Sequence, residues 1–245
     1  MAESAPEITL VQYGGATRGM TMSHPCGKVH MALVFKGLGY KTRHCKTPNE
    51  VKRYNTRGRV PILILNGERI VDSTDILTEL DRRFPNPSLL PADPRARALV
   101  KILEDWADEV LYFYGVYTRW CVPENFARIR SNILAKLPLP LRWIAPAIIS
   151  RKVRGRVEGQ GVGVKDPATV RREVLECLDA LDALLAPGSF AVGDAFTRAD
   201  LSLASIVDQF SLAAINPDLA TEVQKRGNIV AWLARVRAVV PSFAG

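Results

Sequence analysis

The sequence predicts an α/β domain followed by an all-helical domain, and two features carry this prediction. In the stretch 58–80, an apolar run, a tight turn, a second short run and a helical pattern follow one another closely. Beyond residue 95, apolar residues recur at helical spacing in every long segment. A chain of 245 residues fits one small and one larger module. We place the α/β domain at 1–85 and the helical domain at 95–245, joined by a proline-rich linker.

The first half of the chain reads as alternating strands and helices. In order, we expect a strand at 8–13, a helix at 28–38 ended by two glycines, a strand at 40–45 and a short helix at 48–54. Val60-Pro61 then opens the apolar run 62–65. Since proline has no N–H for a sheet ladder, Pro61 must stand where a strand begins or at an edge, and a cis bond before it is expected.

A hairpin and a helix follow this proline. Asn66-Gly67 is a strong hairpin signal, and the run 69–71 supplies the returning strand. Asp72 and Ser73 then precede apolar residues at helical spacing, so they are candidates for the helix N-cap. The positive end of a helix therefore lies beside a strand end, an arrangement that binds carboxylates.

The second half predicts helices throughout. One spans about 95–121 and is stopped by Pro123, and a cleanly periodic one spans 170–185. Several aromatic residues at 112–120 cannot all face one direction on a helix, so some must line a cleft or an interface. Thr197 and Asp200 form a variant capping box, with Phe196 and Leu201 as its hydrophobic staple.

The least typical segment is a long basic insertion around 125–165. Its part from 125 to 157 holds eight Lys or Arg and no acid, so it carries the whole formal charge of +8. Apolar runs lie beside these cations, a mixture suited to an anionic membrane surface or an acidic partner. Solvated helix faces are the alternative interpretation. Nucleic acid is not expected, because aromatic residues do not alternate with the basic ones.

Cysteine, histidine and hydropathy patterns exclude several classes of protein. The four cysteines lack C-x-x-C spacing and the chain starts without an apolar secretory segment, so we expect a cytoplasmic protein. The three histidines lack metal-ligand spacing, so no metal is expected. The longest apolar run has seven residues, whereas a spanning helix needs about 20, so we expect no segment of this sequence to cross a membrane alone.

The order V-P, strand, turn, strand and D-S at a helix start resembles the glutathione-binding half of the glutathione S-transferase superfamily, whose first domain is thioredoxin-like. In that family the residue before the cis proline pairs its backbone with the cysteinyl part of glutathione, and the acid-serine pair holds the γ-glutamyl end. The resemblance assigns these roles to Val60 with Pro61, and to Asp72 with Ser73. Arg59 matches a basic position near the glycyl carboxylate, and the alternative is that it is simply one of the 33 basic residues of the chain.

The stretch S-H-P-C-G-K-V at 23–29 resembles the family pattern S-P-x-C-x-K-V or C-P-x-C-x-K-V. The match puts Ser23 at the position of the catalytic serine or cysteine, and Cys26 at the second cysteine of the redox-active relatives. His24 intervenes where proline usually follows directly, so we expect the loop geometry around Ser23 to differ from that of the family. A plain N-cap is the alternative for Ser23, and a small, partly buried residue is favoured over a redox centre for Cys26. For His24, a polar loop residue is favoured over a general base.

The resemblance implies a glutathione transferase with glutathione as cosubstrate. Ser23 would stabilise the thiolate, and Tyr114 and Tyr117 are candidates for the pocket of a small hydrophobic electrophile, with core packing as the alternative. A homodimer is also implied. Two other functions stay open: glutathione-dependent ether cleavage, and a non-catalytic scaffold that docks a partner or a membrane through the basic insertion. That insertion also faintly resembles the metaxin and failed-axon-connections branch of the same fold.

Overall fold

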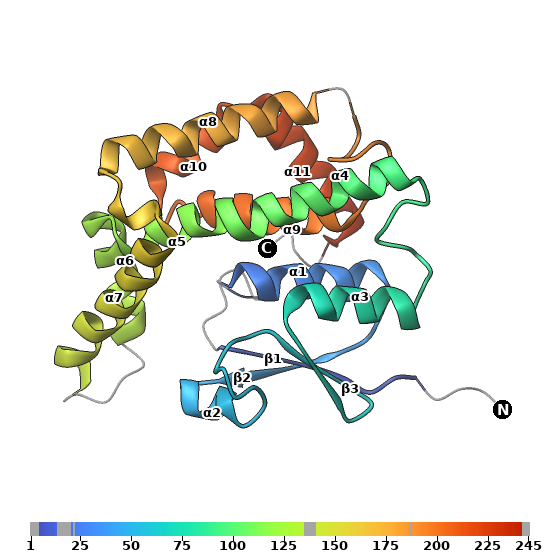
Figure 1. Ribbon diagram of the computed structural model, residues 1–245, viewed down its shortest axis with the longest axis horizontal. Coiled ribbons are helices and arrows are strands. Elements are labelled where there is room, and N and C mark those ends of the chain that lie inside the picture. Colours follow the sequence, from blue (N-terminus) through green and yellow to red (C-terminus); the bar gives the residue numbers. More distant parts are fainter. Residues whose placement is uncertain (1–4, 14–20, 22, 135–140, 187, 242–245) are drawn as a thin grey trace. The chain divides into compact units, whose positions relative to one another are not determined.

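The computed structural model describes residues 5–13, 21, 23–134, 141–186 and 188–241, with the side chains of 131–134 and 141–145 left aside (Figure 1). Its strands are β1 Ile8–Tyr13, β2 Lys41–Cys45, β3 Ile62–Leu65 and β4 Glu68–Val71. Its helices are α1 His24–Phe35, α2 Pro48–Lys52, α3 Ser73–Arg83, α4 Pro94–Asp105, π-helix η1 Trp106–Leu111, α5 Tyr112–Trp120, α6 Pro123–Leu134, α7 Leu141–Gln160, 3-10 helix η2 Val162–Val164, α8 Pro167–Leu185, α9 Arg198–Phe210, α10 Pro217–Gln224 and α11 Gly227–Val239. An α/β half followed by a helical half is therefore confirmed.

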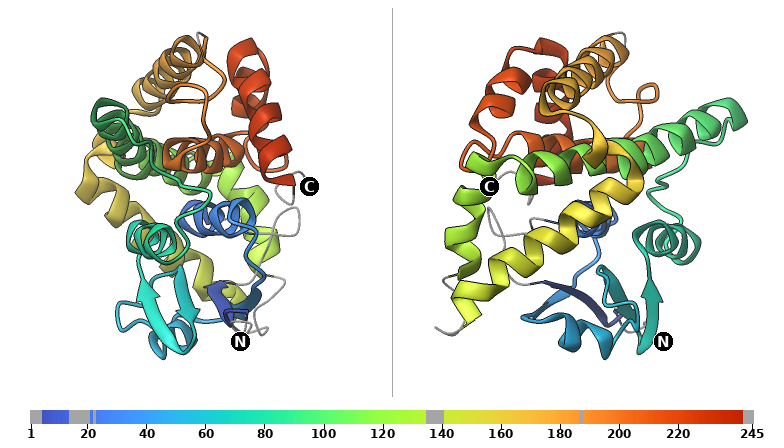
Figure 2. Two further views of the ribbon diagram at one scale, coloured as in Figure 1. Left: turned by 90° about the vertical axis from the view of Figure 1, so that its right-hand side faces the viewer. Right: turned by 60° about the vertical axis from the view of Figure 1, so that its left-hand side comes forward.

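The described strands form one mixed sheet in the order β2-β1-β3-β4. β1 runs parallel to β2 and antiparallel to β3, which pairs antiparallel with β4. Helices α1 and α3 lie side by side on one face of this sheet, and α2 lies on the other (Figures 1 and 2). Side chains alternate along a strand, so Val11 and Ile62 pack with Val51 of α2, while Leu10 and Leu63 point to the face of α1 and α3.

The hairpin of β3 and β4 is confirmed with the predicted turn. Asn66 has φ +51° and Gly67 has φ +84°, the pair of positive φ values that a two-residue type I′ turn requires. The Asn66 side chain also accepts a hydrogen bond from the backbone N–H of Glu7 at 2.9 Å. This contact joins the turn to the segment before β1.

The prediction of one regular helix over 95–121 was wrong in its interior. The segment is α4, then the π-helix η1, then α5, which ends at Trp120. A π-helical stretch accommodates extra residues per turn, so the side chains after it are rotated relative to a regular helix. Pro123 does not merely stop this helix: it begins α6, where the missing N–H of proline costs nothing.

The contacts divide the chain into two compact units, and the first is discontinuous in sequence. Unit 1 contains 1–104, 188–205 and 232–245, and unit 2 contains 105–187 and 206–231. The domain boundary expected at 85–95 stays a prediction. In unit 1, the carboxylate of Asp200 accepts hydrogen bonds from the N–H of Ala191, the N–H and hydroxyl of Thr197 and the indole of Trp232, at 2.8 to 3.0 Å. The Asp200 half of the expected capping box is thus formed, and the same carboxylate joins Ala191 and Trp232 to the start of α9.

In unit 2, α5 packs against α6 and α7. The buried guanidinium of Arg119 donates to the carbonyl of Gly115 and to the side chain of Gln209. Arg226 pairs with Asp179 at 2.7 Å and joins the end of α10 to α8. No helix within the described part of the chain is both long and apolar enough to span a bilayer.

Candidate functional site

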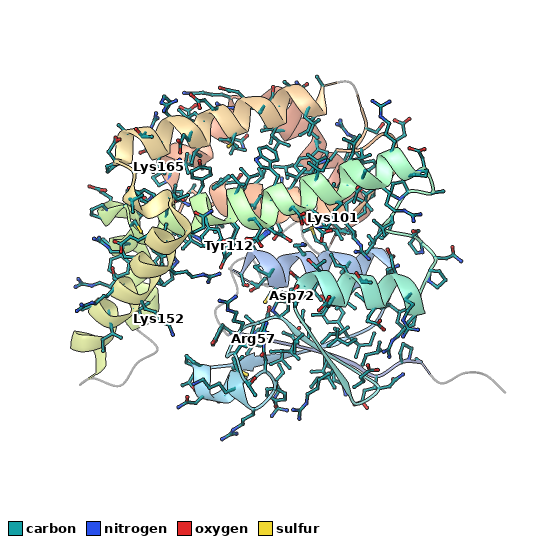
Figure 3. All side chains as sticks on the ribbon, viewed as in Figure 1. Arg57, Asp72, Lys101, Tyr112, Lys152 and Lys165 are labelled. Carbon is teal, nitrogen blue, oxygen red and sulfur yellow. The ribbon has the colours of Figure 1, made fainter. Side chains whose placement is uncertain are left out.

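In unit 1, several predicted site residues are brought to one end of the sheet by strand register. Ile62 of β3 pairs with Val71 of β4. One residue farther along, Pro61 precedes β3 and Asp72 follows β4, so they lie at the same end. The helices α1 and α3 also start there (Figure 1). Figure 3 shows Asp72 at the start of α3 and Arg57 in the loop that leads to Pro61, both at this end.

The loop before β3 is held by internal hydrogen bonds. The hydroxyl of Tyr13 donates to the carbonyl of Gly58 at 2.9 Å, and the amide of Asn55 donates to the carbonyl of Arg59 at 2.9 Å. The bond Val60-Pro61 is cis, as predicted. A second cis bond, Asn86-Pro87 in the linker, was not predicted. The Arg59 side chain is exposed, and Val60 is half-buried.

Asp72 and Ser73 form the entry to α3 and carry an unusual backbone. Asp72 has φ +80° and ψ 137°, a region that residues with a Cβ rarely adopt. Its carboxylate accepts a hydrogen bond from the N–H of Thr74 at 3.0 Å and so caps the helix, while Asp72 itself is exposed. Ser73 is 8% exposed at the first position of α3. A carboxylate thus lies beside the positive end of a helix.

The start of α1 differs from the prediction in one respect. The helix begins at His24, four residues before the expected start, and His24 is 1% exposed. The interpretation of His24 as a polar loop residue is therefore wrong, because the proline at 25 fits the first helical turn and carries His24 into the helix. Ser23 is the N-cap residue with extended backbone, but its side chain makes no capping hydrogen bond.

The hydroxyl groups near this helix start face the sulfur of Cys26. Burial raises the pKa of the Cys26 thiol to about 12, while hydrogen bonds from the Ser23 and Thr21 side chains act in the opposite direction. Thr21 also accepts the N–H of Ser23 at 3.1 Å. Cys26 is fully buried. A thiol with this pKa is neutral at pH 7, so the geometry does not favour Cys26 as a thiolate.

Two contacts that the sequence analysis missed fix α1 from the side opposite the sheet. Lys28 and Glu104 form an ion pair at 2.9 Å with both side chains buried, and Ser205 donates to the carbonyl of His24 at 2.8 Å. The available signal was a lysine in an apolar helical stretch. Because lysine is almost never buried without a partner, such a lysine predicts an acid close to it in the fold. Its partner lies 76 residues away, which no local pattern reveals.

Tyr114 and Tyr117 belong to α5 in unit 2, and both are 7% exposed. The hydroxyl of Tyr114 donates to the carboxylate of Glu173 at 2.8 Å, and Lys165 pairs with the same carboxylate. Burial, with the Glu173 contact, raises the pKa of the Tyr114 hydroxyl. Tyr114 is therefore engaged within unit 2, and a substrate role for either tyrosine stays a prediction.

Two family models match this chain. The model described as "Glutathione S-transferase, N-terminal domain" matches residues 18–88, and "Glutathione S-transferase, C-terminal domain" matches 123–235. The chain belongs to the glutathione S-transferase superfamily. The first match contains the predicted site residues of unit 1 from Ser23 to Ser73. The second contains the basic insertion at 125–165, while Tyr114 and Tyr117 lie just before its first matched residue.

Curated relatives from this superfamily match parts of the chain. A probable glutathione S-transferase of Nicotiana tabacum is 28% identical over 71% of this chain and 61% of its own length. A shorter match of the same name and organism is 36% identical over 34% of this chain and 39% of that protein. The chain therefore spans less than two thirds of these first relatives. A probable maleylacetoacetate isomerase of Caenorhabditis elegans is 26% identical over 79% of this chain and 76% of its own.

The protein LigF of a Sphingobium strain is similar in sequence and in fold. In sequence it is 40% identical over 29% of this chain and 26% of its own. The crystal structure of this β-etherase superposes with a TM-score of 0.69 over 97% of this chain and 98% of its own, at 20% identity. The superposition shows the glutathione transferase fold. The metaxin resemblance stays a prediction.

Proposed function

We propose that this protein is a cytoplasmic glutathione transferase that joins the glutathione thiolate to the electrophilic carbon of a small hydrophobic molecule. The thiolate attacks carbon, a carbon–sulfur bond forms, and either a leaving group departs with the electron pair or a double bond accepts it. In this proposal Val60 pairs with the peptide, Asp72 and Ser73 hold its γ-glutamyl end, Arg59 contacts the glycyl carboxylate, and Ser23 donates to the sulfur.

The observation that carries the proposal is the strained backbone of Asp72. A non-glycine residue at φ +80° costs on the order of 1–3 kcal/mol and is typical of functional sites. This conformation puts a carboxylate next to the start of α3. The carboxylate attracts an ammonium group, and the helix N-terminus with Ser73 attracts a carboxylate. The pair is thus complementary to a free α-amino acid end, such as the γ-glutamyl group of glutathione.

The start of α1 can stabilise a thiolate. A free thiol has a pKa near 8.5. A helix N-terminus contributes roughly 1 kcal/mol and a hydroxyl donor to a charged acceptor about 1.5–3 kcal/mol, which sum to about two pKa units. Ser23, the N-cap residue of α1, would supply this donor, because its hydroxyl can rotate from Cys26 to an external sulfur. Since Cys26 is buried with a raised pKa, we assign the nucleophile to glutathione and not to this chain.

Calorimetry with a matched ligand pair tests this proposal. We expect glutathione to bind, and an analogue that lacks only the α-ammonium to bind about 10 to 100 times more weakly, the value of a charge-assisted hydrogen bond. Asp72→Asn keeps the cap and tolerates positive φ, so this variant should bind both ligands equally weakly. Absence of glutathione binding to the wild-type protein, or a variant that still discriminates the two ligands, would contradict the proposal.

Glutathione-dependent ether cleavage is a second candidate, favoured by the similarity to the β-etherase LigF. In that reaction the thiolate would displace an aryl oxide from an ether carbon, with the same residues holding glutathione. Incubation with glutathione and a β-aryl ether, followed by detection of the released phenol, separates this candidate from simple conjugation. A product that retains the aryl group would exclude it.

A homodimer is part of the proposal. Leu99 and Ile102 lie three residues apart on α4 and are 46% and 61% exposed, so this helix presents an apolar strip that a second copy would cover. Sedimentation equilibrium should give twice the monomer mass. The double variant Leu99→Lys with Ile102→Lys should sediment as a monomer.

The scaffold function is supported by a different surface. Four described cations of α7 are exposed, namely Arg151, Lys152, Arg154 and Arg156. Lys152 projects from α7 in Figure 3, and the apolar side chain of Ile148 is 61% exposed on the same helix. An anionic membrane surface is the partner that this combination fits. Binding to vesicles in the absence of any glutathione chemistry would favour this function over the enzyme.

A further inference from the structure

One face of the sheet in unit 1 carries cations without matching acids. This is the face that α2 covers in part, opposite α1 and α3 (Figure 1). The register places Lys41 and Arg43 of β2 on this face. Lys41 is level with Arg69 of β4, and Arg43 is level with Val11 of β1. All three cations are exposed. Glu68, the acid of β4, alternates to the other face and pairs there with Arg83 of α3.

The two arginines of this face are fixed by one aromatic ring. The guanidinium carbons of Arg43 and Arg69 each lie 5.5 Å from the centre of the Tyr54 ring, within the range of a cation–π contact. Arg69 also donates to the carbonyl of Arg53 at 3.0 Å. Because both arginines contact one ring, their charges are at most twice 5.5 Å, about 11 Å, apart. Two like charges are thus held close together in fixed positions.

Neither arginine forms an ion pair with an acid in the part of the chain described here, and the acid of α2, Glu50, accepts the backbone N–H of Lys46 at 3.0 Å. On the other face of the same sheet, by contrast, arginines are matched: Arg82 and Arg83 both contact Glu79, and Arg198 contacts Asp81. The charges over Tyr54 repel each other, and their N–H donors lie in a fork that fits a carboxylate with two hydrogen bonds. An anion from outside would relieve the repulsion.

β2 adds a second source of affinity because it is an edge strand. Among the described strands it pairs with β1 alone, and residues 41–44 are all exposed. An edge strand offers backbone N–H and C=O groups to an added strand, while side chains at every second position meet across the pair. Lys41 and Arg43 occupy alternate positions on one face. A strand with acids at alternate positions matches this edge and the charges of Lys41 and Arg43. Arg69 belongs to β4 at the other edge of the sheet, and it adds its positive charge to this surface by reaching the Tyr54 ring.

We propose that this surface, made of Lys41, Arg43, Tyr54 and Arg69, docks an acidic, extended polypeptide segment of a partner protein that adds to β2. A polypeptide is favoured over a nucleic acid for two reasons. The Tyr54 ring is already in contact with two guanidiniums and so offers little surface for base stacking. The outer edge of β2, which is unpaired among the described strands, supplies main-chain hydrogen bonds that only a polypeptide can return. The surface is independent of the glutathione site proposed above.

Fluorescence anisotropy of the full chain with labelled peptides tests the docking. The probe is a nine-residue peptide of alternating Asp and Val, compared with a peptide of the same composition whose Asp residues are contiguous, and with an Asn-Val repeat. We expect the alternating acidic peptide to bind at low salt and the other two to bind at least about tenfold more weakly. Binding should weaken in 1 M salt, where the screening length is about 3 Å.

Two double variants identify the surface. Arg43→Gln with Arg69→Gln should weaken binding of the alternating acidic peptide at least about tenfold. Arg43→Lys with Arg69→Lys should have an intermediate affinity, because lysine keeps the charge but lacks the paired N–H donors of the guanidinium. Arg95→Gln with Arg171→Gln removes the same charge from exposed positions on other elements and should change nothing. Circular dichroism confirms that each variant folds.

Several outcomes would overturn the proposal. These are an absence of binding, equal binding of the contiguous peptide, and an equal loss in the control variant, which would reduce the effect to net charge. Tighter, Arg43-dependent binding of a single-stranded oligonucleotide or of anionic vesicles would also overturn it, since the partner would then belong to another class.

Discussion

At the scale of single residues, we expect substitution of Ser23 to impair conjugation and substitution of Cys26 to leave it nearly intact. Ser23→Ala should lower kcat/KM by about one to two powers of ten and raise the pKa of bound glutathione, because a charge-assisted hydrogen bond is lost. The pKa is measured from the thiolate absorbance of the complex as a function of pH. Cys26→Ser should leave conjugation nearly unchanged, since its new hydroxyl meets Ser23 and Thr21. The reverse ranking would indicate a thiol-exchange protein.

His30 predicts a pH dependence of stability. Burial, with a smaller contribution from the nearby His44, lowers the pKa of His30 from 6.5 to about 4. Its ring nitrogens lie 2.7 Å from the Tyr40 hydroxyl and 3.1 Å from the Gln12 side chain. Between pH 6.5 and 4 the imidazole of His30 is protonated in the unfolded chain but stays neutral in the folded chain. The stabilisation is therefore complete above pH 6.5 and is lost as the pH falls toward 4.

Urea denaturation at several pH values measures this effect. From pH 7 to pH 4 the wild type should lose about 3 kcal/mol of unfolding free energy through His30, at roughly 1.4 kcal/mol per pKa unit. A His30→Asn variant should lose less over this range, even if it is less stable throughout. His44→Gln removes only the smaller contribution to the lowered pKa of His30, so its loss should be slightly less than that of the wild type and greater than that of His30→Asn. Parallel curves for wild type and His30→Asn would refute the assignment.

At the scale of elements, local signals sufficed for the hairpin and α3 but not for α1 and α4. Asn66-Gly67 and Asp72 determine their own backbone, so the turn and the start of α3 were predicted at the correct residues. The start of α1 was placed too late, because His24 looked like a loop residue and its burial depends on distant segments. The π-helix η1 leaves no trace in apolar periodicity.

The same limit applies to the candidate site. The positions of Asp72 and Ser73 beside the cis bond followed from the pattern, whereas the contacts that hold α1 did not. Lys28 meets Glu104, and His24 meets Ser205, from segments far along the chain. Such pairs are set by tertiary packing, which a single sequence does not display.

The buried pair of Lys28 and Glu104 predicts a non-additive effect on stability. Glu104→Ala leaves a buried ammonium without its partner and should cost at least about 3 kcal/mol. A double variant, Lys28→Met with Glu104→Leu, replaces both charges by apolar groups of similar size and should recover most of this loss. Urea denaturation of the singles and the double gives the coupling energy. Losses that simply add would mean that the pair contributes little.

At the scale of the whole molecule, the basic insertion concentrates the formal charge. Roughly 1 kcal/mol per basic residue near an anionic surface gives about 4 kcal/mol for the four exposed cations of α7, a millimolar association that Ile148 would strengthen. Co-sedimentation should show binding to anionic but not neutral vesicles, fading in 1 M salt. A variant with Arg151, Lys152, Arg154 and Arg156 changed to Gln should remain in the supernatant.

A second variant controls for net charge in this experiment. It loses four exposed cations of other elements, by changing Lys46, Lys52, Arg95 and Arg171 to Gln. This variant should pellet with anionic vesicles as the wild type does. If both variants behave alike, or if the wild type stays in the supernatant at low salt, the cations of α7 form a solvated face and the scaffold function loses its main support.

At position 72, selection for stability and selection for ligand binding favour different residues, because the backbone of Asp72 is strained. Glycine there would relieve strain on the order of 1–3 kcal/mol and lose only a few tenths in capping, so heat resistance alone favours a change from Asp to Gly. Glycine has no carboxylate, so capture of an amino-acid ammonium favours the acid. A population evolved at high temperature without need of the ligand should lose Asp72 early, whereas one grown with an electrophilic toxin should retain it and gain stability elsewhere.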